Sequence, residues 1–142
     1  MEQIQFASGI QEYRINGKGI LRFHPGDPNL YARFLQAGEK IQQQMEQLSL
    51  KAHSTQQDSL VLMAEADRGM KEVLNWAFGA HNDFDQILGG ISLLAVADNG
   101  KYLVSNLLEA LEPVMTEGAK KCARQQAQMA VHKAEVRKNN ND

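Results

Sequence analysis

The stretch from Leu74 to Val114 constrains the fold more than any other part of this 142-residue chain. It places apolar segments between Gly79, Gly89-Gly90 and Asn99-Gly100, and glycine and asparagine at such positions typically end helices and form turns. The stretch offers no arrangement of side chains suited to catalysis. It therefore predicts a packed helical protein that works by binding.

Residues 3–23 predict a small β-hairpin. Tyr13 and Ile15 precede Asn16-Gly17, and the mainly apolar segment from Ile20 to Phe23 follows it. Asn-Gly between two such segments is the strongest short-range hairpin signal. The pattern also allows a third strand from Gln3 to Ala7.

Residues 28–131 are expected to form a helical core. Asp27 is placed to cap a helix that begins at Pro28, and apolar residues then recur at steps of three and four. This face consists of Tyr31, Phe34, Gly38, Ile41, Met45 and Leu48, and the opposite, solvent-facing side carries Gln36, Gln42, Gln43 and Gln47. The polar residues 49–57 predict a helix end and a connection.

A second helix is predicted from about Asp58 to Phe78, with Gly79 ending it. Asp67 is expected either at the edge of its apolar face or paired with Lys71, four residues further on. The residues near that face are Leu60, Met63, Asp67, Met70, Val73, Leu74, Ala77 and Phe78.

The segment after Gly79 predicts a short helix and two turns. Asn82 or Asp83 can cap the short helix, which contains Phe84, Ile87 and Leu88 and is closed by Gly89-Gly90. The segment from Ile91 to Ala97 is apolar on every side and is expected to be deeply buried. Asp98-Asn99-Gly100 forms a turn before the next helix.

A long helix is expected from Lys101, with a kink near residues 109–112 because Pro113 lies in its interior. Its apolar face thins after Gly118, so residues 132–142 predict a frayed, basic and polar tail. That face carries Val104, Leu107, Leu108, Leu111, Met115, Gly118, Cys122, Met129 and Val131. The predicted fold is mainly α, a single domain over residues 1–142 with an N-terminal β-hairpin and a long kinked C-terminal helix.

Charge is distributed unevenly along the chain. Residues 118–142 hold six basic and two acidic groups, a net of +4, whereas residues 1–117 hold nine basic and fifteen acidic groups, a net of −6. The basic end lacks interleaved aromatic residues and a groove-reading motif, so a solvated helix face is expected and a nucleic-acid partner is not. No apolar run approaches the ~20 residues that cross a bilayer, and the N-terminus does not resemble a signal peptide. The protein is expected in the cytoplasm, without a membrane partner.

His81, Asp83 and Asp85 are the candidates for a metal site. Their alternation converges only in an extended loop, and no other His or Cys lies nearby in sequence to complete a site. Capping of a turn and a helix by Asp83 and its neighbours accounts for the same residues without a metal. No nucleophile motif, phosphate-binding loop or dinucleotide turn is present, so no enzymatic activity, cofactor or small-molecule substrate is expected. The single Cys122 excludes an internal disulfide and is expected to pack or to lie on the surface.

Aromatic and methionine side chains are the candidates for a binding surface. Trp76, Phe78 and Phe84 belong either to the core or to an adaptable groove, because methionine repacks easily around partners and aromatic rings anchor interfaces. The candidate partner-binding residues are Trp76, Phe78, Phe84, Met115, Lys120, Lys121, Arg124 and Met129.

The order of several motifs resembles the tail assembly chaperones of long-tailed phages and Gram-positive-type prophages. The motifs are FG…NDF at residues 78–84, LGG…LLA at residues 88–95, NG at Asn99, NLLEALEPV at residues 106–114 and, more weakly, FHPGDPNLYARF at residues 23–34. The resemblance implies a chaperone that binds the tape measure protein, keeps it soluble and helps tail tube subunits assemble around it. It further implies action in the host cytoplasm and absence from the mature virion. Independently of the resemblance, the +4 charge of residues 118–142 and the −6 charge of residues 1–117 permit self-association. The alternative is a small helical structural subunit of a tail or head–tail connector.

The resemblance also raises the question of a longer form made by frameshifting. Arg137-Lys138-Asn139 is compatible with the codons AGA-AAA-AAC, on which paired tRNAs can slip back by one base. A frayed polar tail explains the same residues without slippage. Codons other than AAA for Lys138 would exclude the slip at this place.

Overall fold

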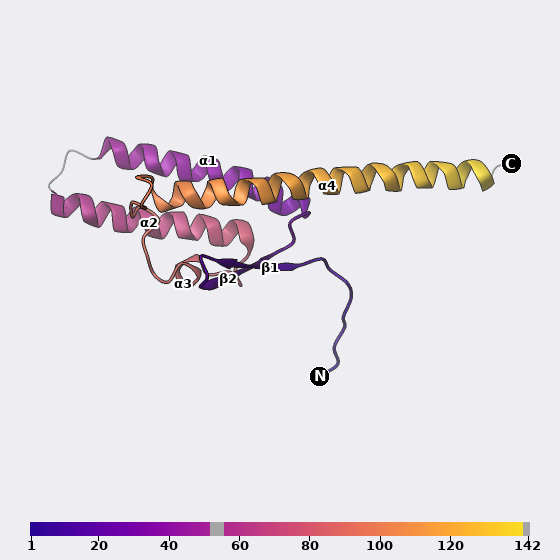
Figure 1. The fold of residues 1–142 in the computed structure, drawn as a ribbon, viewed down its shortest axis with the longest axis horizontal. Helices are drawn as coiled ribbons and strands as arrows, with labels where there is room; N and C mark the ends of the chain where they lie inside the picture. Colours follow the sequence, from indigo (N-terminus) through magenta and orange to yellow (C-terminus); the bar gives the residue numbers. More distant parts are fainter. Residues whose placement is uncertain (52–55, 141–142) are drawn as a thin grey trace.

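The computed structural model describes residues 1–51 and 56–140. In order, its elements are β1 (Gln11–Ile15), β2 (Gly19–Phe23), α1 (Pro28–Leu50), α2 (Gln56–Phe78), α3 (Phe84–Ile87) and α4 (Leu103–Asn140). Helices α1 and α2 pack along each other, α4 runs beside α1, and α3 contacts both α2 and the hairpin (Figure 1). The later part of α4 projects beyond the other elements (Figure 1). The predicted mainly helical fold with an N-terminal hairpin and a long C-terminal helix is confirmed.

The hairpin forms where Asn16-Gly17 predicts it. Both residues have positive φ, 50° and 73°, as the favoured hairpin turns require, and the N–H of Lys18 donates to the carbonyl of Ile15 at 3.0 Å. Strands β1 and β2 pair antiparallel from Gln11↔Phe23 to Ile15↔Gly19. Residues 1–10 belong to no strand and are all exposed, so the third strand from Gln3 to Ala7 is absent.

Helix α1 begins at Pro28, as predicted, because the Asp27 carboxylate accepts the N–H of Asn29 at 2.9 Å. Its glutamine face is exposed, also as predicted. Four residues, Leu30, Phe34, Ala37 and Ile41, are fully buried, and Tyr31, Met45 and Leu48 pack partly against them. The buried stripe therefore includes Leu30 and Ala37, which the sequence pattern did not single out. The predicted connection over residues 49–57 lies partly outside the described residues.

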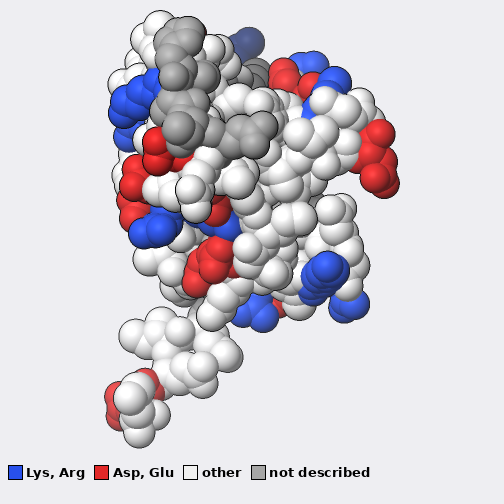
Figure 2. Space-filling view, turned by 90° about the vertical axis from the view of Figure 1, so that its left-hand side faces the viewer, with Lys and Arg blue, Asp and Glu red and all other residues white. Residues whose placement is uncertain are grey.

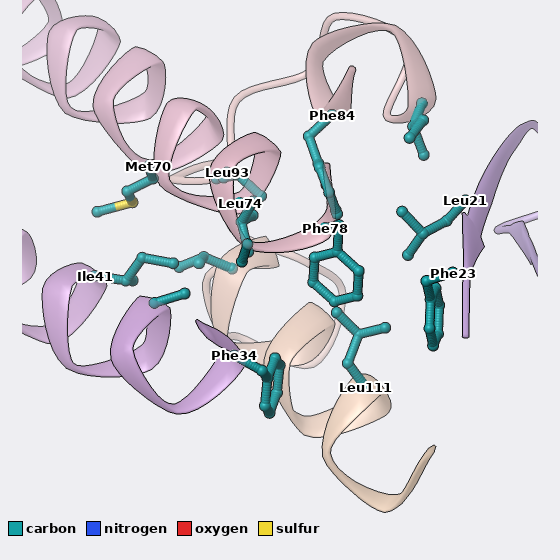
Figure 3. Packing of buried hydrophobic residues seen from close by; sticks show 14 of the residues in the cluster. Leu21, Phe23, Phe34, Ile41, Met70, Leu74, Phe78, Phe84, Leu93 and Leu111 are labelled. Atoms are coloured by element: carbon teal, nitrogen blue, oxygen red, sulfur yellow. The ribbon is translucent and has the colours of Figure 1, made fainter. Parts of the chain in front are cut away.

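A single apolar cluster joins the hairpin to the helices, and Figure 3 shows its centre. The ring of Phe78 lies 5.2 Å from that of Phe23, 6.3 Å from Phe34 and 5.5 Å from Phe84, measured between centroids. Tyr13 stacks on Phe23 at 4.6 Å and extends the cluster to β1. These rings come from both strands and three helices, so their packing holds the hairpin on the helical layer.

Helix α2 differs from its predicted face at Leu60, and of the two alternatives for Asp67 the structure has the pair with Lys71. Leu60 is 67% exposed, so it is not part of the core. Asp67 does not lie unpaired at the edge of the face, because its carboxylate contacts Lys71 Nζ at 2.9 Å. The helix ends at Phe78 as predicted, and Gly79 follows with a φ of 108°.

The turns between α2 and α4 are largely as predicted. The Asp83 side chain caps α3 by accepting the N–H of Asp85 at 3.0 Å, and Gly89-Gly90 closes the helix with positive φ at both residues. The segment from Ile91 to Ala97 is not buried as a whole. Only Leu93 and Leu94 enter the core, because the segment lies on the surface as successive turns and not as a buried element.

Helix α4 begins at Leu103, two residues later than predicted, and contains Pro113 in its interior. Figure 1 shows α4 without a sharp bend along its length, so the kink predicted near residues 109–112 is not seen. Pro113 is exposed, so the carbonyl that loses its partner can be hydrated. Residues 132–140, predicted to fray, are helical, which fits the high helix propensity of their alanine, lysine and arginine residues. The rest of that tail, 141–142, lies outside the described residues.

Candidate functional site

Helix α4 leaves the packed part of the molecule at Gly118, its last buried residue. A Cβ atom there would lie 1.7 Å from the carbonyl oxygen of Pro25, so the helix backbone touches the turn before α1. Residues 119–140 are called distal α4 below, and all of them except Ala119 and Cys122 are exposed. At about 1.5 Å per residue, distal α4 extends roughly 33 Å from that contact.

One apolar stripe runs along both parts of α4. Its members, Met115, Cys122, Met129 and Val136, follow each other at intervals of seven residues. Met115 is 1% exposed in the core, Cys122 is half-buried, and Met129 and Val136 are 60% and 43% exposed. Because seven residues make about two helical turns, these four side chains lie on one face of the helix. Distal α4 therefore presents this repeat to solvent without a helix beside it in the described part of the chain.

Basic side chains lie on several sides of distal α4. They are Lys120, Lys121, Arg124, Lys133, Arg137 and Lys138. One of them, Lys120, approaches Glu117 at 4.0 Å, and both side chains are well exposed, so this pair adds little stability. The positive charge of distal α4 thus remains available to an acidic partner.

The structure divides the eight predicted partner-binding residues into two groups. Trp76, Lys120, Lys121, Arg124 and Met129 are exposed. Phe78, Phe84 and Met115 are only 4%, 0% and 1% exposed, so the structure favours the core alternative for the two phenylalanines. The two phenylalanines belong to the aromatic cluster and Met115 packs in the same core, so their burial holds the fold together and leaves no surface for a partner.

Trp76 lies on the face formed by α1 and α2, apart from distal α4. Lys40 of α1 places its Nζ 4.0 Å from the centre of the indole ring, a cation–π contact. The indole nevertheless remains 44% exposed. Trp76 is therefore a separate exposed aromatic group and is not brought together with the basic residues of α4.

A partly buried ion-pair network holds the turns of residues 79–97 on α2, and the sequence pattern predicted only its pair of Lys71 with Asp67. Lys71 Nζ contacts Asp67 at 2.9 Å and Asp85 at 2.7 Å, and it donates to the carbonyl of Ile91 at 2.8 Å. Burial alone would lower the pKa of Lys71, but the hydrogen bonds to Asp85 and Asp67 outweigh it and raise the pKa. All three donor sites of the ammonium group are occupied, so this lysine is a structural clamp.

Asn82 is a second clamp, which the sequence suggested only as a possible cap. Its side chain accepts the N–H of Arg22 at 3.0 Å and donates to the carbonyls of Arg22 at 2.8 Å and Phe78 at 2.9 Å. It thereby joins the outer edge of β2 to the end of α2. An asparagine just after a helix-ending glycine is the signal that could have identified it.

The three candidate metal ligands have separate partners. His81 lies against Gly79 and Asn82, Asp83 caps α3, and Asp85 pairs with Lys71. The capping prediction for Asp83 is confirmed. Across residues 1–51 and 56–140, no group of three or more His, Cys, Asp or Glu side chains is arranged to hold a metal ion.

An apolar groove of about 570 Å³ lies between the hairpin, the turns of residues 87–97 and the first half of α4. It is called the hairpin groove below. Its walls include Tyr13 and Ile15 from β1, and Leu107, Ala110 and Val114 from α4. Among its lining residues the charged ones are Arg14 and Lys18, both basic. The groove is thus suited to apolar side chains accompanied by an acidic group.

Comparison with known proteins gives no match: neither a family model, nor a curated protein, nor a solved structure matches this chain. Among the described helices, none combines the length and the apolar character that crossing a membrane requires.

Proposed function

We propose that this protein is a non-enzymatic tail assembly chaperone of a phage or prophage. It binds the tape measure protein, keeps that long helical chain soluble and promotes assembly of the tail tube around it. The proposal draws on the motif order between residues 78 and 114 and on one structural observation, the exposed stripe of distal α4. A long amphipathic client exposes an apolar stripe of the same kind, and two such stripes bury each other when the helices lie side by side.

The charge of distal α4 supports the same mode of binding. A net of +4 over residues 118–142 attracts an acidic client helix and speeds the encounter, while Met129 and Val136 supply the contacts that remain after docking. This division predicts that salt weakens association mainly through its rate, whereas loss of the apolar residues removes the complex.

The test is co-expression with the tape measure protein, identified as the very long helical protein encoded next to this chain. With the wild-type protein, a large fraction of the client is expected to remain soluble and to co-purify. The double variant Met129→Asp/Val136→Asp should abolish both effects. The control, Ala127→Asp/Ala134→Asp, adds the same charge on the opposite side of the same helix and should retain them.

Equal behaviour of the two double variants would contradict the role given to the stripe. Mass spectrometry of finished particles then separates a chaperone from a structural subunit of the tail or connector. A chaperone leaves during assembly and is absent from the particle, whereas a subunit is present in a fixed number of copies.

A further inference from the structure

The N-terminal arm, residues 1–10, is an apolar segment without a place in the fold. Met1 is fully exposed, and Ile4, Phe6 and Ile10 are 90%, 83% and 61% exposed. Figures 1 and 2 show the arm standing clear of the body, with uncharged side chains over most of its length. In an extended strand, Ile4, Phe6 and Ile10 would point to one side and Gln3 and Gln5 to the other. This is the pattern of a strand with one buried face. The arm therefore has the sequence of a strand that lacks a sheet.

The hairpin has one open edge that such a strand can join. On the outer edge of β2, the Asn82 side chain bonds both the N–H and the carbonyl of Arg22. Because those groups point away from β1, Arg22 and its partner Glu12 form a non-hydrogen-bonded pair. By the same alternation, the backbone groups of Glu12 and Arg14 point outward from β1. Within residues 1–51 and 56–140 no strand pairs with that edge.

We propose that the N-terminal arm of one copy adds as a strand to the outer edge of β1 in a second copy and places Ile4 and Phe6 in its hairpin groove. Residues opposite one another in a sheet share a face. If Gln3 and Gln5 bond the outward groups of Arg14 and Glu12, then Ile4 lies opposite Tyr13, whose side chain lines the groove. The glutamines remain in solvent and the apolar side chains are buried.

Charge fixes the direction of the added strand. Glu2 is the one charged side chain of the arm, and Arg14 and Lys18 are the charged residues that line the groove. An arm antiparallel to β1, with Ile4 opposite Tyr13, carries Glu2 toward the turn end of the hairpin, where both basic residues lie. A parallel arm would carry Glu2 away from them.

The arm of the same chain is less suited to this edge than that of a second copy. Gly9 has a φ of 82°, and a Cβ there would lie 2.8 Å from His24 Nε2, so its backbone is packed on the imidazole. Running back along its own β1 would require the chain to reverse within residues 7–10 and to leave this contact. An arm of ten residues spans roughly 33 Å when extended, enough to reach a neighbouring molecule.

Light scattering of the full chain over a concentration series tests the proposal. The wild-type mass should rise from monomer to dimer or beyond. Ile4→Asp/Phe6→Asp should weaken association by roughly tenfold or more, since two apolar anchors are lost. Gln3→Asp/Gln5→Asp, on the other face of the arm, should change it by about threefold or less. Ala110→Arg, which fills the groove from an exposed position on α4, should weaken it as strongly as the first variant.

Mixing identifies the two partners of the contact. The Ala110→Arg protein keeps an intact arm, and the Ile4→Asp/Phe6→Asp protein keeps an intact groove, so the two should form a heterodimer at concentrations at which each alone is monomeric. A monomeric wild-type protein at all concentrations overturns the proposal. So does a monomer whose residues 3–6 are protected from hydrogen exchange, because that result places the arm on its own sheet. The proposal does not depend on the chaperone function. If both arm variants associate as strongly as the wild type, this proposal is refuted and the chaperone function is unaffected.

Discussion

The first part of α4, residues 103–118, buries Val104, Leu111 and Met115 in the core, whereas distal α4 leaves Met129 and Val136 in solvent. The two parts belong to one continuous helix and share one apolar stripe. The difference shows that helix formation and burial are separate properties of this chain. Tertiary packing stabilises the first part, while the second depends on the helix propensity of its own residues.

From this comparison we expect substitutions in the core to lower the free energy of unfolding far more than substitutions on distal α4. The largest effect is expected for Phe84→Ala, because Phe84 is 0% exposed and contacts Phe78 at the centre of the core. The loss should be about 3–5 kcal/mol in the free energy of unfolding. Denaturant unfolding followed by circular dichroism measures it, with Met129→Ala on distal α4 as the control that should change little. A loss under about 1 kcal/mol would mean that the aromatic cluster is not the centre of stability.

The second-largest loss in the free energy of unfolding is expected for Lys71, whose ion pairs with Asp67 and Asp85 have no counterpart on distal α4. Lys71→Met keeps the bulk of the side chain and removes its charge. Asp85 is 62% exposed and Asp67 keeps its bond from the N–H of Leu93, so the cost should be about 2–3 kcal/mol, below the value for a fully buried pair.

The stabilisation from Lys71 has a defined pH dependence. Its pKa in the folded protein lies above the ordinary value of 10.5. The ion pairs therefore contribute fully below pH 10.5, and the contribution is lost as the pH rises through the folded-state pKa. The difference in unfolding free energy between wild type and Lys71→Met should be constant near neutral pH and shrink above pH 10.5. A difference that grows with pH would contradict the clamp.

Gly118 marks the boundary between the two parts of α4, and its substitution gives the third effect. Gly118→Ala places a methyl group against the carbonyl of Pro25, so helix and turn must separate at a cost of about 1–3 kcal/mol. The control is Gly38→Ala in α1, where a Cβ meets nothing within 4 Å. That change should stabilise the protein by about 0.5–1 kcal/mol through helix propensity. Thermal unfolding measures the change in stability of each variant. A change of the same sign in both variants would contradict the close contact at Gly118.

Local signals predicted the boundaries of the fold well. Asp27 as a cap, Asn16-Gly17 as a turn and Gly79 as a helix end each act within a few residues, so their physics is contained in the sequence. The exposure of Leu60 and Val96 was not predictable in this way. Both lie in apolar patterns, and only the packing of distant segments decides which members of a pattern find a partner.

The candidate site shows the same limit. The basic residues of distal α4 were identified by charge, which requires no tertiary information. For Phe78 and Phe84 the sequence left core and interface both open, because an aromatic residue in a core and one at an interface have the same local pattern. The burial of Lys71 depends on Asp85, fourteen residues away in the chain, which approaches through the turn after α2. The exposed stripe of distal α4 repeats a pattern that is buried in the first part of the same helix, so only the structure separates the buried members from the exposed ones.

The smallest effect on stability is expected from the removal of distal α4 itself. Deletion of residues 119–142 takes away no buried side chain among the described residues, and Gly118 keeps its contact with Pro25. The free energy of unfolding of the remaining chain should change by no more than about 0.5 kcal/mol. The helical signal per molecule should fall, because residues 119–140 are helical in the full chain. A loss above about 1 kcal/mol would show that distal α4 packs against the body in solution, which would remove the distinction between the two parts of α4. The expected result is unchanged stability together with loss of client binding. It would mean that distal α4 binds the client and does not stabilise the fold.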